Sequence, residues 1–374
     1  MEPKPGQKIL TCFLILVFIL IMGVENIQAL EVGGKIEIQT GLFYNEDLKT
    51  NLSGLGELEF FLPETRNLST RLVLRAKMDD LSPELGIKYL YLRRQLENGH
   101  ITLGRQPISW SYGAIINPLD YGFGVEDLAG ESISPEIDGI RYFHSLGDGA
   151  SLQFVTGFSE GLREQPLERL GYGARLRVPR AGSDFSLNLI DQPISFVLGQ
   201  LEDNLFRVGL TYSGDVGSLG VYGTLGYFIL RDLEMDDFVG QVGIDYSWKV
   251  GPEYQEQTVY FQGEYLRFFK KELGPLFFMQ MGEGSNLVSG EILNENNSPE
   301  FFDLFVANLS MEIGPFSQAG TAFITETGDW LIGLVPYYQT DLGGGVELRV
   351  GGNLLRDVQG DVSVGGNVVL SYYF

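Results

Sequence analysis

From residue 31 onward, apolar and polar side chains alternate along most of the chain. In the last segment, Val364, Val368, Leu370 and Tyr372 all occupy even positions, whereas serine, glycine and asparagine dominate the odd positions. A period of two residues is typical of a β-strand with one apolar face. Long stretches with the helical period of 3.6 residues are missing. The pattern therefore predicts an all-β fold.

Glycine, proline, asparagine, aspartate and serine punctuate the alternating segments and mark their ends. About eighteen strands result, an even number within the range of bacterial membrane barrels. Sixteen is the competing count, because 137–145, 184–203 and 300–325 alternate less cleanly. The expected strands are 31–44, 51–61, 66–77, 84–95, 99–106, 137–145, 149–158, 170–179, 184–190, 204–213, 218–230, 238–250, 256–269, 300–312, 316–325, 330–340, 344–354 and 361–374.

The length of these segments favours a membrane rather than water. Segments of roughly 9–13 residues suit a tilted crossing of the bilayer, whereas strands of soluble proteins cluster near 5–6 residues. Many apolar faces end in an aromatic residue, as expected at the headgroup level. An open sheet edge would lack hydrogen-bond partners in lipid, so the sheet must close. We predict a transmembrane antiparallel up-and-down β-barrel over 30–374, with a soluble multi-sheet protein as the alternative.

Residues 1–29 have the three parts of a secretory signal peptide. Lys4 and Lys8 precede an apolar run, and Ala29 supplies a small residue for cleavage. The apolar run has about 16 residues, slightly fewer than the roughly 18–20 of a spanning helix, which remains the alternative interpretation. Cleavage would remove Cys12, the only cysteine, which suits an oxidising compartment.

Composition excludes several classes of function. A net charge of −23 is the wrong sign for a nucleic-acid binder, which needs basic surfaces to neutralise phosphates. One cysteine and two histidines leave few ligands for a zinc or thiol site, so we expect no metal and no cofactor. An enzyme is not expected either, because His100 and His144 adjoin tight turns and no Gly-x-Ser-x-Gly elbow occurs.

The connections between strands alternate in length. Tight turns such as 97–99, 147–149 and 343–345 fall on one side of the predicted sheet, and the long connections fall on the other. Short periplasmic turns and longer outer loops are the arrangement of bacterial outer-membrane barrels. Arg93-Arg94, beside the first of these turns, is interpreted as a charge pair at the periplasmic rim. The long connections are 107–136, 159–169, 191–203 and 270–299.

Two stretches resemble known bacterial proteins. The C-terminal SYYF resembles the signal by which the barrel-assembly machinery recognises outer-membrane barrels, with Tyr372 and Phe374 as its aromatic residues. The stretch LGRQPISW at 103–110, continuing to INPLD at 116–120, resembles one found in porin-like and alginate-export-like outer-membrane proteins of Gram-negative bacteria. The resemblance implies a barrel in the cell outer membrane through which solutes pass.

The long connection 107–136 is the third outer loop, which in general porins folds into the lumen and narrows it. It is acidic, with Asp120, Glu126 and Asp127, and it has no lysine or arginine. An arginine or lysine facing lipid at mid-depth would cost about 2–4 kcal/mol, so we assign the basic strand residues to the lumen. Acidic loop and basic wall are predicted to form a constriction with a transverse field. The basic residues are Arg71, Arg75, Lys77, Arg141, Arg175, Arg177 and Arg207.

The predicted function is passive diffusion of small hydrophilic solutes or ions through this charged lumen. In an alternative reading, the arginines pair with acids such as Glu57 and Glu59 and fill the lumen. Acidic outer loops predict a mild cation preference. A structural barrel or surface adhesin without an open pore is the other alternative. Outer-membrane lipid, the assembly machinery and small solutes are the expected partners, and the sequence leaves open whether the barrel forms a homotrimer.

Overall fold

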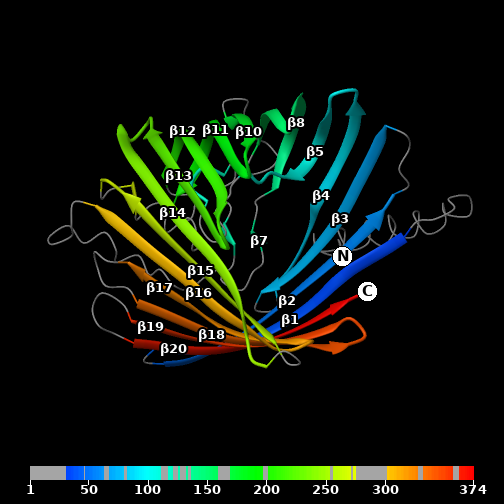
Figure 1. The fold of residues 1–374 in the computed structure, drawn as a ribbon. Helices are drawn as coiled ribbons and strands as arrows, with labels where there is room; N and C mark the ends of the chain where they lie inside the picture. Colours follow the sequence, from blue (N-terminus) through cyan, green and yellow to red (C-terminus); the bar gives the residue numbers. More distant parts are fainter. Residues whose placement is uncertain are drawn as a thin grey trace, which may run out of the picture.

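The computed structural model describes most of the chain after residue 30, nearly all of it as β-strands (Figure 1). The predicted signal peptide, 1–29, lies outside the described residues. No helix within the described part is long and apolar enough to cross a membrane. The described residues are 31–45, 47–62, 67–79, 82–110, 117–120, 125–126, 132–133, 136–158, 169–196, 201–252, 256–270, 273–274, 301–326, 332–356 and 362–374.

Eighteen strands form one antiparallel sheet, and two very short strands, β6 and β7, pair with each other. The expected count of eighteen is therefore confirmed, and sixteen is excluded. The strands are β1 (Glu31–Asn45), β2 (Asp47–Phe61), β3 (Leu68–Asp79), β4 (Ser82–Leu96), β5 (Gly99–Pro107), β6 (Val125–Glu126), β7 (Ser132–Ile133), β8 (Glu136–Gly147), β9 (Ala150–Phe158), β10 (Gly171–Arg180), β11 (Ser183–Phe196), β12 (Leu201–Val216), β13 (Leu219–Leu230), β14 (Met235–Val250), β15 (Gln257–Phe268), β16 (Phe302–Gly314), β17 (Ser317–Glu326), β18 (Ile332–Gly343), β19 (Val346–Arg356) and β20 (Val362–Tyr373).

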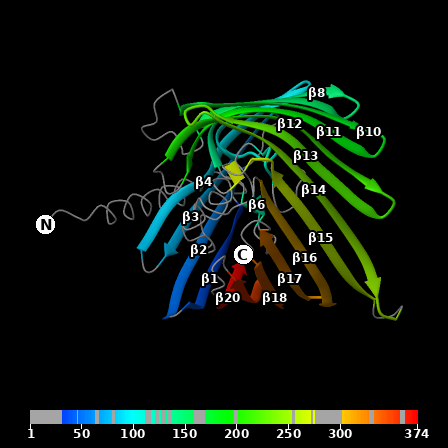
Figure 2. The same cartoon turned by 90° about the vertical axis from the view of Figure 1, so that its left-hand side faces the viewer.

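The sheet closes on itself. Each strand of the large sheet pairs with its neighbour along the chain, and β1 pairs with both β2 and β20 (Figures 1 and 2). Beyond the last paired residue, Gly34 N donates to Phe374 O at 2.9 Å and Phe374 N donates to Gly34 O at 3.1 Å. A closed ring leaves no free edge at its seam, which confirms the predicted β-barrel.

The two faces of the wall differ as the alternation predicts. On β20, Val364 and Leu370 are 48% and 45% exposed, whereas the neighbouring Ser371 is 3% exposed. Ser371 points inward, where its hydroxyl donates to Glu37 Oε2 at 3.1 Å. Large apolar side chains thus cover the outer surface, which is the surface that lipid contacts in a membrane barrel.

Tight turns join the strands at one end of the barrel. The turn between β18 and β19 contains Gly343, Gly344 and Gly345, with φ values of 85°, 64° and 80°. Residues with a side chain are strained at positive φ, so a turn with three successive positive φ angles requires glycine at each position.

The wall is uneven in height. β5 and β9 have nine residues each, whereas β12 and β14 have sixteen. β4 pairs with β3 from Ser82 to Arg94, interrupted at Lys88, but it pairs with β5 only from Leu90 to Leu96. Two buried apolar clusters lie among inward-facing residues: a large one on β12 to β17, and a smaller one on β8, β9 and β11.

Candidate functional site

The chain turns into the barrel directly after β5. Pro107 is the last residue of that strand, and proline has no N–H with which to extend a ladder. Ile108 and Trp110 then become 0% and 1% exposed, packed with inward-facing residues such as Ile137 and Val155. The start of the predicted constriction loop is therefore enclosed by the barrel.

The residues of the porin-like stretch close this part of the loop. Asp120 Oδ1 accepts a hydrogen bond of 2.5 Å from Trp110 N, and Asp120 N donates to Asn117 O at 3.1 Å. The indole of Trp110 donates to Gln153 Oε1 on β9 at 3.2 Å. Tryptophan and aspartate thus join the two ends of the segment and tie it to the wall.

Arg207 on β12 anchors the same segment. This arginine is fully buried, and its guanidinium donates to Pro118 O at 3.0 Å, Asp120 O at 2.7 Å and Gln192 Oε1 at 2.9 Å. Leu119, between the two carbonyls, belongs to the large apolar cluster on β12 to β17. One charged group and one apolar side chain therefore fix the loop inside the lumen.

This placement differs from the predicted constriction. Arg207 and Asp120 were expected on opposite sides of a water-filled gap, but they are buried together, with Asp120 only 1% exposed. The main-chain carbonyl of Asp120, not its carboxylate, meets Arg207. Glu126 belongs to the short strand β6, and Asp127 lies outside the described residues.

The predicted basic wall on β3 is largely paired with acids. Arg71 Nε lies 2.6 Å from Glu59 Oε1, and Arg75 Nε lies 2.9 Å from Glu57 Oε1. Lys77, near the end of β3, is exposed. The alternative in which arginines pair with Glu57 and Glu59 thus describes these contacts.

The predicted arginines on β10 differ in surroundings. Arg177 forms an ion pair with Asp184 of β11. Arg175 is 6% exposed and lies opposite Gln153 of β9.

A bulge turns one unpredicted lysine toward the lumen. The register of β3 against β4 shifts between Val73 and Leu74, so that Lys88 is an extra residue on β4. Strict alternation would give Lys88 the outward parity of Leu90, but a bulge re-aims the side chain. Its ammonium reaches Glu57 Oε1 at 2.7 Å. Sequence periodicity could not reveal this residue, because the bulge breaks the period.

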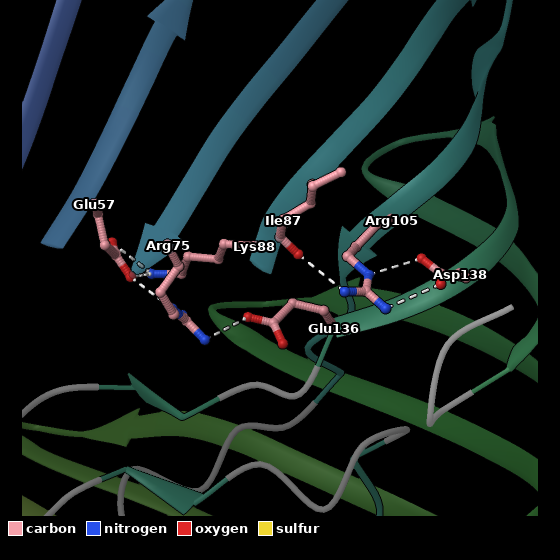
Figure 3. Close-up of polar contacts among 7 residues, drawn as sticks. All are labelled: Glu57, Arg75, Ile87, Lys88, Arg105, Glu136 and Asp138. Atoms are coloured by element: carbon pink, nitrogen blue, oxygen red, sulfur yellow. Dashed lines mark hydrogen bonds and ion pairs between the residues drawn. The ribbon is translucent and has the colours of Figure 1, made fainter. Parts of the chain in front are cut away.

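Two further polar contacts cross the region where β4 and β5 part (Figure 3). Arg75 Nη1 lies 3.2 Å from Glu136 Oε1, at the start of β8. Arg105 on β5 donates to Ile87 O on β4 at 2.9 Å. Arg105 also pairs with Asp138 of the adjacent strand β8 at 2.8 and 3.0 Å. Among the described residues of the predicted loop, Glu136 is an acid that contacts the predicted basic wall.

Arg93 and Arg141 form a second basic feature, which we call the arginine pair. In the register, Thr102 of β5 lies opposite Arg93 on one side and Arg141 on the other. Thr102 is fully buried, and Leu92 and Arg94 have the outward parity, so all three residues of the row point inward. Arg93 therefore lies on the inner face of β4, and its assignment to the periplasmic rim stays a prediction.

The arginine pair has no acidic partner within the described part of the chain. Arg93 Nε is 3.4 Å from the Thr102 hydroxyl, and its guanidinium lies over the ring of Tyr91, 5.7 Å from the centroid. Arg141 Nε has no hydrogen-bond partner among the described residues, and Arg93 and Arg141 lie on either side of Thr102 on the same face of the sheet. Half-buried like charges of this kind favour an anion between them.

The other chemistry weighed from the sequence has little support in the geometry. His144 Nδ1 lies 3.1 Å from the hydroxyl of Tyr142, on the outward parity near a periplasmic turn. Within the described residues, no group of three or more histidine, cysteine, aspartate or glutamate residues is arranged to hold a metal ion.

Comparison with known proteins agrees with this architecture. OccK2 (OpdF) of Pseudomonas aeruginosa, solved with glucuronate, matches with a TM-score of 0.59 at 10% identity, over 92% of this chain and 96% of that one. OccAB4 of Acinetobacter baumannii matches with a TM-score of 0.56 at 10% identity, over 94% and 99%. The outer membrane protein OpdK of P. aeruginosa matches with a TM-score of 0.55 at 11% identity, over 92% and 99%. The chain has the fold of an outer-membrane porin.

The porin-like resemblance is thereby confirmed at the level of the fold. No protein-family model matches the chain, and no curated protein matches it by sequence. The alginate-export-like part of the resemblance therefore stays a prediction.

Proposed function

We propose that the protein is an outer-membrane channel through which small hydrophilic solutes and ions diffuse passively, with a preference for anions. A closed porin-fold barrel with an apolar outer surface is suited to the outer membrane. Inside the barrel, a loop held by buried hydrogen bonds from Arg207 and Trp110 narrows the lumen. The closed barrel, the outer-membrane location and the narrowed lumen together favour the diffusion of solutes over the role of a structural barrel or adhesin.

The arginine pair is the observation that carries the anion preference. Arg93 and Arg141 face the lumen. Charges act on a permeating ion over a Debye length of about 8–10 Å, so charges on the lumen wall act on the ion along its path more directly than charges on the outer loops. The cation preference expected from the acidic loops is replaced by the opposite expectation.

Two neighbours are consistent with a polar, anionic solute class. OccK2 was solved with glucuronate, and OpdK of P. aeruginosa was also solved with vanillate, with a TM-score of 0.55 to this chain. Both ligands carry a carboxylate. We extend this chemistry to the present chain as part of the proposal, together with recognition by the assembly machinery and assembly as a homotrimer.

Planar-bilayer recording of the refolded barrel tests the proposal. We expect unit conductance steps and, in a KCl gradient, a reversal potential on the anion-selective side. Replacing Arg93 and Arg141 by glutamine should move the reversal potential toward the cation-selective side, because the lumen loses its unpaired positive charge.

Arg94→Gln is the matched control. It removes the same charge from the adjacent residue, whose parity is outward, and it should leave the reversal potential unchanged. If the refolded wild-type barrel shows no conductance steps, the proposed channel function is overturned, and a barrel with a filled lumen or a structural role is favoured. Equal reversal potentials in the wild type and the double variant would overturn the anion preference.

A further inference from the structure

The ladder between β4 and β5 is too short to cross a membrane. Their register runs from Leu90↔Arg105 to Leu96↔Gly99, which is seven residue pairs. A transmembrane strand needs about 9–11 residues. Within the described part of the chain, no strand pairs with the Ser82–Tyr89 half of β4 on this side. The two strands therefore part inside the depth of the bilayer, at its outer side.

Two features of the sequence separate the strands there. Pro107 ends β5 and the next residue, Ile108, is already buried inside the barrel, so the chain leaves the wall. On β4 the bulge at Lys88 breaks the alternation at the same level. The guanidinium of Arg105 then donates a hydrogen bond to the carbonyl of Ile87 on the β4 edge, where no described strand supplies a backbone N–H. Unpaired backbone is tolerated at membrane depth only where it borders water or protein.

On the β4 side, the edge of the opening is apolar on the outside and open on the inside, whereas the β5 side carries Arg105 on the outward parity, paired with Asp138. Leu85 and Ile87 are 37% and 42% exposed on the outward parity. Gly86 lies between them on the inward parity, opposite Arg75, and a Cβ placed on it would meet none of the described residues within 4 Å. An apolar outer lip thus leads directly to free space beside the lumen wall.

The charges on the inner side are balanced. Lys88 and Arg75 share Glu57, and Arg75 also meets Glu136, so two cations face two anions. This group offers polar hydrogen-bonding atoms without a net charge that would select an ion. Such an opening suits a molecule with an apolar body and a neutral polar end.

We propose that the parting of β4 and β5 is a side portal through which neutral amphipathic molecules pass between the lumen and the outer leaflet. The apolar body lies against Leu85 and Ile87, and the polar end reaches the ion-paired group at Arg75. This route is separate from the passage of hydrophilic solutes along the barrel axis, and neither one requires the other.

Uptake of a neutral apolar dye by cells of a Gram-negative host tests the portal. N-phenyl-1-naphthylamine is the probe, because it fluoresces in lipid and a lipopolysaccharide leaflet admits it slowly. Expression of the wild-type protein should raise the rate of dye uptake severalfold. Gly86→Trp, which places an indole in the open space, should return the rate to that of cells without the protein.

Gly314→Trp is the matched control, because Gly314 also has nothing within 4 Å of its Cβ position but lies at the far end of β16. It should leave dye uptake unchanged. Gly86→Ala fills almost none of the space and should behave as wild type. Heat-modified gel migration shows whether each variant folds, and Gly86→Leu replaces the tryptophan variant if that variant does not.

Uptake of a small sugar by the same cells separates the two proposals. Loss of dye uptake with normal sugar uptake in Gly86→Trp supports the portal. If Gly86→Trp loses both dye uptake and sugar uptake, the space at Gly86 belongs to the axial pore and the portal is overturned. The portal is also overturned if dye uptake is unchanged in Gly86→Trp, or if the wild type shows no dye uptake above background. Dye uptake without sugar uptake in the wild type would overturn the hydrophilic channel and leave the portal standing.

Discussion

Arg207 donates a hydrogen bond of 2.7 Å to the main-chain carbonyl of Asp120. The two residues are 87 positions apart in the sequence, and both are buried inside the barrel. The side chain therefore recognises the path of the loop backbone rather than the charge of a loop residue. We therefore expect the width of the lumen to depend on this arginine through the loop backbone that it holds.

Replacing Arg207 by methionine should release the loop without unfolding the barrel. The change keeps the side-chain volume but leaves the carbonyls of Pro118 and Asp120 buried without a donor, at a cost of about 1–3 kcal/mol. Single-channel conductance should rise and become noisier. Arg231→Met, at an exposed turn where the arginine is 53% exposed, is the control and should leave the conductance unchanged. A steady wild-type conductance in the Arg207 variant would contradict the anchor.

Adjacent residues of β20 test which face meets lipid. Val368→Lys puts a charge on the outer surface near the middle of the strand, where it should cost about 2–4 kcal/mol. Asn367→Lys puts the same charge on the inner parity, where water is available, and should cost much less. The free energy of unfolding in lipid vesicles, from guanidinium titration, measures both. Equal losses would show that the assigned faces are wrong.

Deletion of Phe374 tests the C-terminal residue in two settings. The deletion removes both backbone hydrogen bonds to Gly34, each worth about 0.5–1.5 kcal/mol, so refolded barrels should be slightly less stable. Phe374→Ala keeps these bonds and removes only the ring. If the ring is an assembly signal, Phe374→Ala should insert poorly in cells but fold normally into vesicles. Normal insertion in cells would leave the ring without that role.

For much of the barrel wall, the face on which each side chain lies could be predicted from the two-residue period alone. The inward position of Ser371 and the outward position of Leu370 could be predicted because lipid and water select opposite chemistry on alternate residues. The same rule placed Arg71 and Arg75 on the inner face. Each of these strands keeps its period from end to end, so local sequence suffices.

The interior could not be predicted in the same way. Lys88 reverses its face because of a bulge, which periodicity does not reveal. Asp120 was read as a charge in the lumen, yet its carboxylate bonds to a backbone N–H and its carbonyl meets Arg207. Such contacts join segments far apart in the sequence, and only the folded path of the loop decides them. Arg93 and Arg94 were interpreted together as one charge pair, although adjacent residues of a strand face opposite sides, so the grouping of Arg93 with Arg141 was missed.

The uneven height of the wall has a consequence for the surrounding membrane. Lipids beside the nine-residue strands β5 and β9 meet a lower hydrophobic belt than lipids beside the sixteen-residue strands β12 and β14. A bilayer adapts to a short belt by thinning, and to a tall one by letting the protein tilt. We therefore expect the surrounding lipid to be thinnest next to β5 and β9, and the barrel to tilt in one fixed direction from the membrane normal.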